Sequence, residues 1–429
     1  MRLWDKGYST ENLIEEFTVG NDRELDMHLA KYDVIASKAH ATMLESIGIL
    51  DKSELEDLLS ELDKMLADVE SGTFEIAESF EDVHSKIEYD LTQKVGDAGK
   101  KIHTGRSRND QVLVCLHLYI KAEIEAIKVQ VKELFELLLK LSDEHKDKLI
   151  PGYTHLQAAM PSSFGMWFSA YAESLVDDVH LLNAAFKIAD QNPLGSGAGY
   201  GSSFPLNRTM TTEAMGFETL KYNSVAAQMS RGKVEKSTAF ALSSVAGTLS
   251  KMSMDITLYM SQNFGFLTFP DELTTGSSIM PHKKNPDVFE LTRAKCNKIQ
   301  NLPNELLLIT NNLPSGYHRD LQLVKESFIP AIESMKACLT VAIFSLEKII
   351  VKSNITEDKI YDYIFSVDVL NEDMKKGTPF RDAYKNVAQS VADGSYKPKR
   401  ELDHTHEGSV GNLCNNEIRE KFEIAYGNS

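Results

Sequence analysis

Residues 110–145 read DQVLVCLHLYIKAEIEAIKVQVKELFELLLKLSDEH and carry the pattern that decides the fold. Apolar residues step by four and three in alternation, at Ile120, Ile124, Ile127, Val131, Leu134, Leu138 and Leu141. This spacing marks one face of a helix that is on the order of 50 Å long at about 1.5 Å per residue. Such a long apolar seam needs partners along its length, which a bundle of long helices or a subunit interface would supply.

The rest of the chain also has mainly helical patterns. No proline precedes Pro151, and proline is the main breaker of helix interiors. A helix is expected from an N-cap at Ser53 to Gly72, because apolar residues recur between them at helical spacing. Further helices are expected at about 162–190, 232–262, 286–311 and 325–352, with few and short strands. The sequence therefore predicts an all-α fold with a helical N-terminal domain (1–109), a central bundle of long helices (110–352) and a small helical C-terminal domain (353–429).

Composition narrows the class of protein. The chain has 429 residues, a 42% apolar fraction and a net charge of −17, which argues against a general nucleic-acid surface. The first residues are polar, so we expect no secretory signal, and no apolar run of 18 residues suggests a membrane span. Four cysteines lie far apart without metal-ligand spacing, which is typical of reduced thiols. We expect a cytoplasmic protein with no nucleic-acid or membrane partner.

The segment from Thr275 to Asp287, TGSSIMPHKKNPD, is the most informative polar stretch of the chain. It gathers hydroxyl, ammonium and carboxamide groups between prolines that forbid a regular helix. Burying so many polar groups would be costly, so the segment is not a core element. We expect it to bind an anion and to place a hydroxyl group against it.

Three more polar segments stand where helices break. Residues 103–111, HTGRSRNDQ, precede the long helix. Backbone N–H groups at the start of that helix, together with two arginines, favour the binding of an anion. The alternative is a capping segment whose arginines are solvated. Residues 151–157, PGYTHLQ, hold a histidine suited to proton transfer near neutral pH, although a lone histidine is often structural. Residues 314–326 hold Gln322 and Lys325, which would share one face of a helix.

Two other patterns carry no chemistry. The glycine-rich run 195–201 lacks the spacing and the preceding strand of a dinucleotide site, and is expected to be a flexible linker. His404 and His406 follow Asp403 in a polar tail, where solvated side chains are the simpler interpretation. The sequence therefore predicts no metal.

These motifs together resemble the argininosuccinate lyase family of the fumarase/aspartase superfamily. The resemblance covers nearly the whole chain. It rests on the loop at 275–287 and on EDVH at 81–84, HTGRSRNDQV at 103–112, PGYTHLQ at 151–157, NPLGSGA at 192–198 and LPSGYHRDLQ at 313–322.

The resemblance implies an all-α fumarase/aspartase-like fold and an elimination that splits argininosuccinate into arginine and fumarate without a cofactor, as in arginine biosynthesis. It implies that Ser277 is the general base, that Lys283 stabilises the charge formed, and that His155, positioned by Glu290, is the acid or electrostatic helper. It also implies substrate contacts for a further set: Asp26, Arg108, Asn109, Thr154, Asn285, Tyr317, Gln322 and Lys325.

The family also implies a small-molecule substrate and a homotetramer whose active sites combine segments of three subunits. Some positions depart from its usual pattern, namely Ala158, Met160, His282, the neighbours of Arg231, and a short C-terminal region. His282 is usual in adenylosuccinate lyases, so that activity or another fumarate-releasing lyase is one alternative. A crystallin-like structural protein without catalysis is the other, although it would not need Ser277 or His155.

Overall fold

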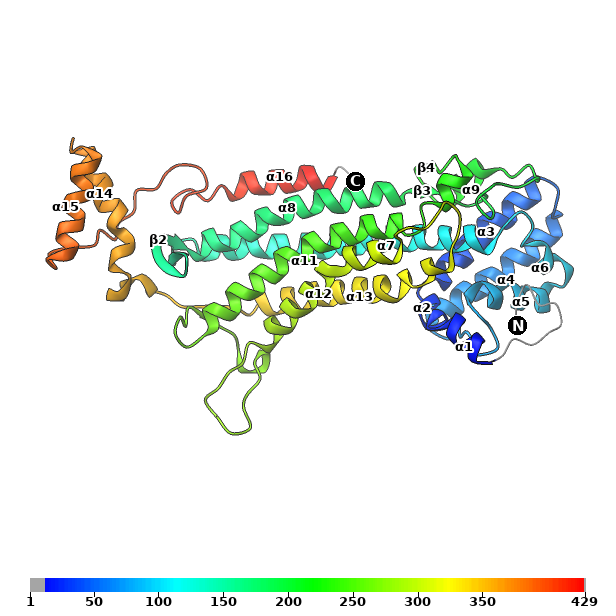
Figure 1. Cartoon of the computed structure of the whole chain (residues 1–429), viewed down its shortest axis with the longest axis horizontal. Helices are drawn as coiled ribbons and strands as arrows, with labels where there is room; N and C mark the ends of the chain where they lie inside the picture. The colour runs from blue at the N-terminus through cyan, green and yellow to red at the C-terminus, as the bar shows by residue number, and fades with distance from the viewer. Residues whose placement is uncertain (1–11, 428–429) are drawn as a thin grey trace.

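The computed structural model of the protein describes residues 12–427 and shows an elongated, mostly helical molecule (Figure 1). The predicted all-α fold is confirmed. The first residues of the chain, on which the expectation of no secretory signal rests, lie outside the described range. Long helices run along the molecule, with a group of shorter helices at the N-terminal end and another at the opposite end (Figure 1).

The N-terminal group has its own apolar cluster, which includes Val34, Leu58 and Leu91. Its helices are α1 (Asn12–Val19), α2 (Asp22–Asp26), α3 (Ala30–Ser46), α4 (Lys52–Ser71), α5 (Val83–Val95) and α6 (Asp97–Lys101). The predicted N-cap at Ser53 is wrong. Helix α4 begins after Asp51, whose side chain accepts from the backbone N–H of Glu54 while Glu54 accepts from that of Asp51.

The central bundle contains the long helix that the apolar pattern predicts. Its members are α7 (Arg108–Glu144), α8 (Phe164–Ala189), α11 (Lys233–Met260), α12 (Asp287–Ile309) and α13 (Val324–Leu346). The seam of α7 from Ile120 to Leu141 is at most 5% exposed at every one of its predicted positions. The chain's own helices therefore cover this seam, and it needs no second subunit.

The start of α7 is fixed by its cap. Ser107 and Asp110 form a capping box, and the second carboxylate oxygen of Asp110 accepts from the backbone N–H groups of Gly195 (3.0 Å) and Gly197 (2.8 Å). Both glycines have positive φ, at +85° and +61°, which residues with a side chain rarely adopt. The expected flexible linker is thus a turn that is tied to the bundle.

Short elements connect the helices. The strands form three pairs: the antiparallel hairpin of β1 (Leu149–Thr154) and β2 (Gln157–Ser163), the parallel pair β3 (Gln191–Asn192) and β4 (Thr219–Leu220), and the antiparallel pair β5 (Leu267–Thr268) and β6 (Ile350–Val351). Two short helices are α9 (Arg208–Ala214) and α10 (Ser224–Gln228). Short 3-10 helices lie at Asp271–Leu273, Arg319–Gln322, Ile355–Glu357 and Lys359–Phe365. Helix α13 ends before the predicted residue 352 because Ile350 and Val351 pair with β5 instead.

The C-terminal region forms α14 (Ser366–Lys375), α15 (Phe380–Ala392) and α16 (Asn415–Gly427). Helix α16 returns along α8 (Figure 1). It also contacts α7, because the ring of Phe422 in α16 stacks on that of Phe135 in α7 with centroids 3.8 Å apart. The side chain of Asn183 in α8 donates to the carbonyl of Ala425 at 2.7 Å. Helix α16 therefore packs as part of the central bundle. The predicted division of the chain into three domains, with boundaries after residues 109 and 352, stays a prediction.

One helical stretch among the described residues, Arg319–Leu346, is long and apolar enough to cross a membrane by length and composition alone. Charged and polar residues interrupt this stretch, so it is not an uninterrupted apolar run. Its apolar side chains include Phe328, Ile332 and Leu339, which are buried in the bundle core. The apolar character of this stretch is thus explained by packing within the bundle.

Candidate active site

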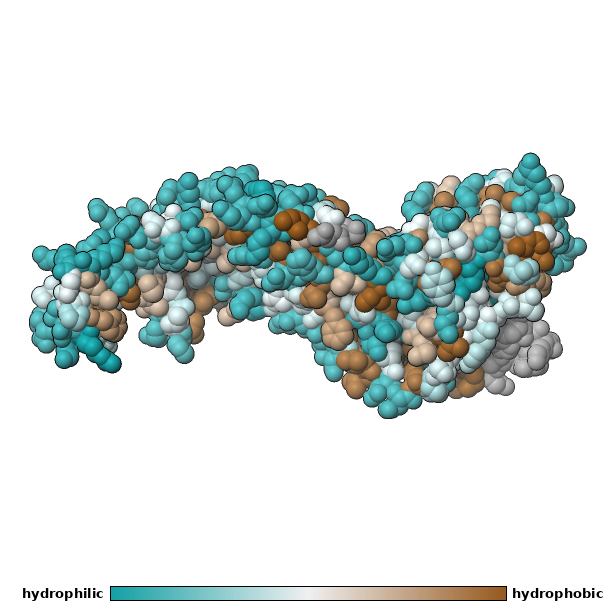
Figure 2. Space-filling model, turned by 90° about the horizontal axis from the view of Figure 1, so that it is seen from above, coloured by the Kyte–Doolittle hydropathy of each residue, from teal (hydrophilic) through white to brown (hydrophobic). Residues whose placement is uncertain are grey.

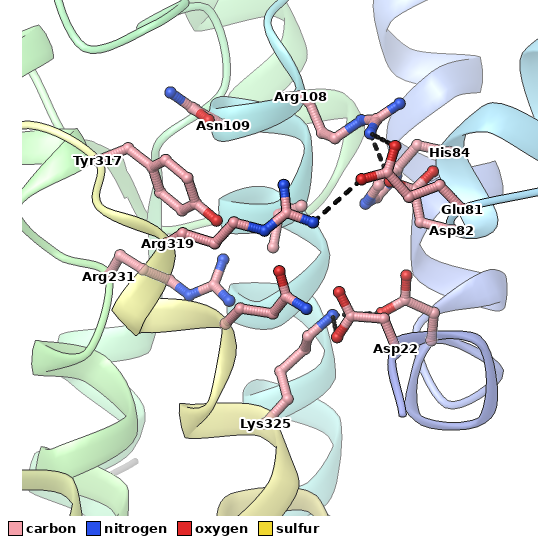
Figure 3. A pocket seen from close by; sticks show the side chains of 13 residues that line it. Asp22, Glu81, Asp82, His84, Arg108, Asn109, Arg231, Tyr317, Arg319 and Lys325 are labelled. Atoms are coloured by element: carbon pink, nitrogen blue, oxygen red, sulfur yellow. Dashed lines mark hydrogen bonds and ion pairs between the residues drawn. The ribbon is translucent and has the colours of Figure 1, made fainter. Parts of the chain in front are cut away.

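A cavity of about 110 Å³ lies where α2, the start of α7 and the segment before α13 meet (Figure 3). It is lined by Asp22, Asp26, Glu81, Asp82, His84, Arg108, Asn109, Val112, Arg231, Tyr317, Arg319, Gln322 and Lys325. Four of these side chains are acidic and four are arginine or lysine, so the cavity can contact groups of both charges. Six of the eight predicted substrate-binding residues are among them.

Lys325 holds one side of this cavity together. Its ammonium lies 2.6 Å from a carboxylate oxygen of Asp26 and 2.8 Å from one of Asp22, and the side chains of Lys325 and Asp26 are at most 4% exposed. Burial alone would lower the pKa of Lys325, but the two carboxylates outweigh it and raise that pKa. The lysine is therefore a fixed cation that links α13 to α2.

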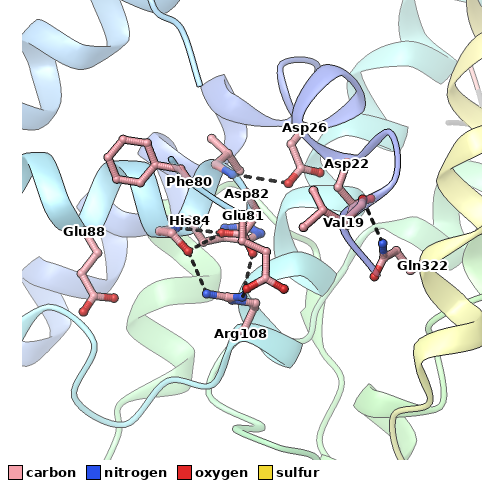
Figure 4. A network of polar contacts seen from close by, with 12 residues as sticks. Val19, Asp22, Asp26, Phe80, Glu81, Asp82, His84, Glu88, Arg108 and Gln322 are labelled. Atoms are coloured by element: carbon pink, nitrogen blue, oxygen red, sulfur yellow. Dashed lines mark hydrogen bonds and ion pairs between the residues drawn. The ribbon is translucent and has the colours of Figure 1, made fainter. Parts of the chain in front are cut away.

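Arg108 holds the opposite side, at the first turn of α7. Its guanidinium lies 2.9 Å from Asp82 and 3.2 Å from Glu81, and donates to the hydroxyl of Ser85 at 2.8 Å (Figure 4). Glu81 also lies 3.1 Å from Arg319 (Figure 3). These pairs bring the 81–84 segment and the segment before α13 to the same wall.

Gln322, Tyr317 and Asn109, which were also predicted to bind substrate, line this cavity too. Gln322 donates to the carbonyls of Thr18 (2.9 Å) and Val19 (3.3 Å), so its side chain is held against α1 (Figure 4). Tyr317 stays 36% exposed, and Asn109 lies in the first turn of α7. Arg231 lines the cavity while its side chain lies 3.2 Å from Glu235 and donates to the carbonyl of Leu321.

His84 stands at the back of the cavity against a fully buried carboxylate. Its Nδ1 is 3.0 Å from Asp33. Burial alone would lower the pKa of His84, but the charge of Asp33 outweighs it and raises that pKa. Asp33, His84 and Cys115 place three potential metal-ligand atoms within 4.8 Å of one another. Arg106 and His84 already balance the negative charge of Asp33, so this carboxylate needs no metal ion to compensate it. That no metal is bound stays our prediction.

The loop that holds Ser277 is closed at its base. The backbone N–H of Asn285 donates to the carbonyl of Thr275 at 2.8 Å, and the Asn285 amide donates to the Thr275 hydroxyl (3.2 Å) and the Gly276 carbonyl (3.3 Å). Within the loop, Ser277 Oγ accepts from the backbone N–H groups of Ile279 (3.3 Å) and Met280 (3.2 Å). Two donors converging on one hydroxyl oxygen would stabilise its alkoxide.

Lys283, Asn285 and Glu290 line a second and larger cavity, of about 1210 Å³, beside this loop. His282, Lys284 and Lys352 line it as well, so the cavity holds three lysines and, with Asp287 and Glu290, two carboxylates. The structure therefore brings the predicted anion-stabilising groups together near Ser277, in a place separate from the first cavity.

Thr154 and His155 lie at the exposed tip of the β1–β2 hairpin, in neither cavity. The register pairs Thr154 with Gln157, so His155 and Leu156 form the turn. Both have left-handed φ, at 54° and 57°. That conformation costs L-amino acids roughly 1–2 kcal/mol each. The residue predicted as the acid or electrostatic helper thus lies on a strained and exposed turn.

Within one chain, the predicted site residues fall in three places. Figure 1 shows the hairpin at the end of the bundle opposite α1 and α2, and the loop before α12 projecting from the same half of the bundle as the hairpin. The first cavity is lined by residues of α2 and the start of α7 and lies at the N-terminal end. The long helices of the bundle separate the hairpin from the first cavity, so one chain does not bring His155 to Lys325.

Sequence reasoning missed several residues that line the first cavity: Asp22, Glu81, Asp82, His84, Arg231 and Arg319. Asp22 could have been found because it precedes Asp26 by four residues and shares its face of a helix. Glu81, Asp82 and His84 lie in a motif that was recognised but given no role. Arg231 carries no local signal of this kind.

Comparisons with known proteins identify the family of this chain. A model of the Lyase family matches residues 7–301. A protein of Bacteroides thetaiotaomicron named argininosuccinate lyase is 58% identical over 97% of this chain and 94% of its own length. Among solved structures, an EDDS lyase in complex with formate gives a TM-score of 0.76 at 20% identity, covering 98% of this chain and 90% of that one. A class II fumarase of Schistosoma mansoni gives a TM-score of 0.76 at 16% identity, covering 100% and 97%. The chain belongs to the argininosuccinate lyase family of the fumarase/aspartase superfamily.

Proposed function

We propose that this chain catalyses the reversible elimination that cleaves the C–N bond of argininosuccinate and yields arginine and fumarate. The observation that carries this proposal is the 58% identity to a relative named argininosuccinate lyase over 97% of the chain. The site residues expected from that family are all present, and each lies in a cavity, in the loop or on the hairpin tip described above.

Ser277 is proposed as the base that removes a proton from the carbon beside a succinyl carboxylate. A serine hydroxyl is too weak a base unless its alkoxide is stabilised, and the N–H groups of Ile279 and Met280 already point at Oγ. Lys283 and Asn285 would then hold the dianionic centre left on the substrate. The C–N bond breaks as the double bond of fumarate forms, and the departing nitrogen takes a proton for which His155, positioned by Glu290, is the proposed donor.

The charges of the first cavity support a substrate with groups of both signs. Argininosuccinate carries carboxylates together with an ammonium and a guanidinium group. Arg108, Arg319 and Lys325 offer partners for carboxylates, and Asp22 and Asp26 for a cation. We assign the predicted substrate contacts accordingly, with Asp26 toward the arginine end.

A homotetramer with shared sites is the proposed assembly, because the three groups of site residues lie apart in one chain. The bundle helices also expose large apolar side chains: Leu181, Phe240, Met254, Leu291, Leu307, Leu308 and Phe344. Figure 2 shows apolar patches that reach the surface of one face of the molecule. Such patches are typical of subunit contacts. A cytoplasmic location is proposed as well, and the four unpaired cysteines support it.

The test of the reaction is the ultraviolet absorbance of fumarate after purified protein is added to argininosuccinate or to adenylosuccinate in parallel. Turnover of argininosuccinate is expected, and turnover of adenylosuccinate alone would refute the proposal. Ser277→Ala should lower kcat by about 10²–10⁴-fold or more with nearly unchanged substrate affinity. Near-wild-type turnover in this variant would move the base to another residue, with His155 the next candidate.

Sharing of the site is tested by mixing two inactive variants. His155→Asn and Ser277→Ala assemblies should each be nearly inactive. Denaturing and refolding them together forms mixed assemblies, in which some sites hold neither substitution, so activity should return to a modest fraction of wild type. Light scattering should show tetramers. If verified mixed assemblies stay inactive, the two residues do not come from different chains of one site.

A further inference from the structure

The hairpin turn of His155 and Leu156 is built from residues that do not favour its backbone. Two-residue hairpin turns with positive φ at both positions favour Asn-Gly or Asp-Gly, because these residues adopt left-handed conformations most easily. Leucine offers neither the freedom of glycine nor a polar side chain that could bond locally. Leu156 nevertheless has φ of 57°. Local turn chemistry therefore does not explain a leucine at this position.

Packing within the chain does not explain it either. The residue Leu156 is 73% exposed, so its side chain gains little apolar burial. The hairpin behind the tip is held in place, because Tyr153 packs edge-on against Phe264 at 5.4 Å and its hydroxyl lies 3.4 Å from that of Tyr361. The strands thus present an apolar side chain at a fixed position, pointing away from the protein's own core.

The residues beside Leu156 indicate what covers it. Thr154 and His155 are exposed, and their side chains have no hydrogen-bond partner within the described part of the chain. Both are assigned to a site that also includes the groups of the first cavity, and α2 and the start of α7, which line that cavity, lie at the other end of the bundle from the hairpin (Figure 1). That site is incomplete without a second copy of this chain, so the hairpin tip must enter one for His155 to act.

We propose that Leu156 is a positioning residue for this site: its side chain is buried in a second copy of the chain, and this anchor holds the strained turn so that His155 faces the reacting groups. The inference rests on the proposed function. Since His155 and Leu156 share one turn, movement of the leucine changes the direction of the imidazole. A small displacement of a catalytic group lowers the rate of the chemical step more than the affinity for substrate.

The variant Leu156→Gly tests the proposal, because glycine keeps the left-handed backbone while it removes the anchor. We expect kcat for argininosuccinate to fall tenfold or more and KM to change less than threefold. The thermal midpoint should not decrease, since glycine adopts this backbone without strain. Leu156→Met keeps an apolar side chain of similar size at this position and should retain most of kcat.

The matched control is Met160→Ala, which removes a 40% exposed apolar side chain from the extended part of the same hairpin. It should keep kcat within about twofold of wild type. Equal kcat values for Leu156→Gly and Met160→Ala would overturn the proposal. Loss of the assembly in Leu156→Gly, seen by light scattering, would also overturn it, because Leu156 would then be an assembly contact. A wild-type protein inactive on argininosuccinate would instead refute the proposed function.

Discussion

Replacing Lys325 by methionine should destabilise the protein strongly, because it removes the cation shared by two carboxylates. The Lys325 ammonium lies 2.6 Å from Asp26 and 2.8 Å from Asp22. Without it, the Asp26 side chain, which is 2% exposed, keeps a long contact of 3.4 Å with the backbone N–H of Val83. Breaking a buried ion pair from one side costs about 3–5 kcal/mol in free energy of unfolding.

The pH dependence of this loss follows from the same groups. Burial raises the pKa of Asp22 although Lys325 opposes this, so removal of the lysine should raise that pKa further. The folded variant then binds protons more tightly than its unfolded chain, so its stability increases as the pH falls. The loss relative to wild type should therefore be smaller at about pH 5 than at about pH 7.5.

Urea unfolding followed by circular dichroism, at one fixed protein concentration, measures these free energies. Adding Asp22→Asn and Asp26→Asn to Lys325→Met should recover much of the loss, since no buried charge is then unpaired. Lys31→Met is the control, because Lys31 pairs with Glu70 at 3.0 Å but both side chains are about half exposed, and it should cost less than about 1 kcal/mol. A loss below about 1 kcal/mol for Lys325→Met at both pH values would refute the reasoning.

Three further outcomes are expected. Asp51→Ala should lower the free energy of unfolding by about 1 kcal/mol in urea titrations through loss of the α4 cap, while Ser53→Ala should change it by less than about 0.5 kcal/mol; equal effects would contradict the cap assignment. Burial lowers the pKa of His117 to about 4, so wild-type stability should decrease as the pH falls from about 6.5 toward 4, and thermal scans of His117→Gln should show a smaller decrease. Phe422→Ala should remove the stack on Phe135 and cost about 3–5 kcal/mol, with faster proteolysis of residues 393–414 as the readout; unchanged proteolysis would show that α16 is held by other contacts.

The sequence predicts the long helices well because their apolar spacing is a local property. Helix α7 was expected from about residue 110 to 145 and runs from Arg108 to Glu144. Its ends follow from caps, which local patterns also encode. The N-cap of α4 is Asp51 and not the predicted Ser53. Asp51 and Glu54 have the spacing of a capping box, so the sequence itself contains the pattern that indicates the correct cap.

What the sequence could not predict depends on contacts between distant segments. Helix α13 ends before β6 because Val351 pairs with strand β5. No local sequence pattern shows this pairing. The site residues were recognised from motifs, yet their separation into two cavities and a hairpin tip depends on the lengths and directions of the helices. Arg231 was missed as a cavity residue because the segments that surround it are far away in the sequence.

The return of α16 along α8 affects how the chain can fold during its synthesis. Arg419 in α16 contacts Glu136 in α7, 283 residues earlier in the sequence, and Phe422 covers Phe135 nearby. A ribosome makes α16 after the other helices of the bundle, so α7 keeps an apolar strip exposed to solvent until α16 has been made. Chains that stop early would keep that strip exposed and be prone to aggregate or to be recognised by chaperones. The bundle thus closes only after α16 has been made.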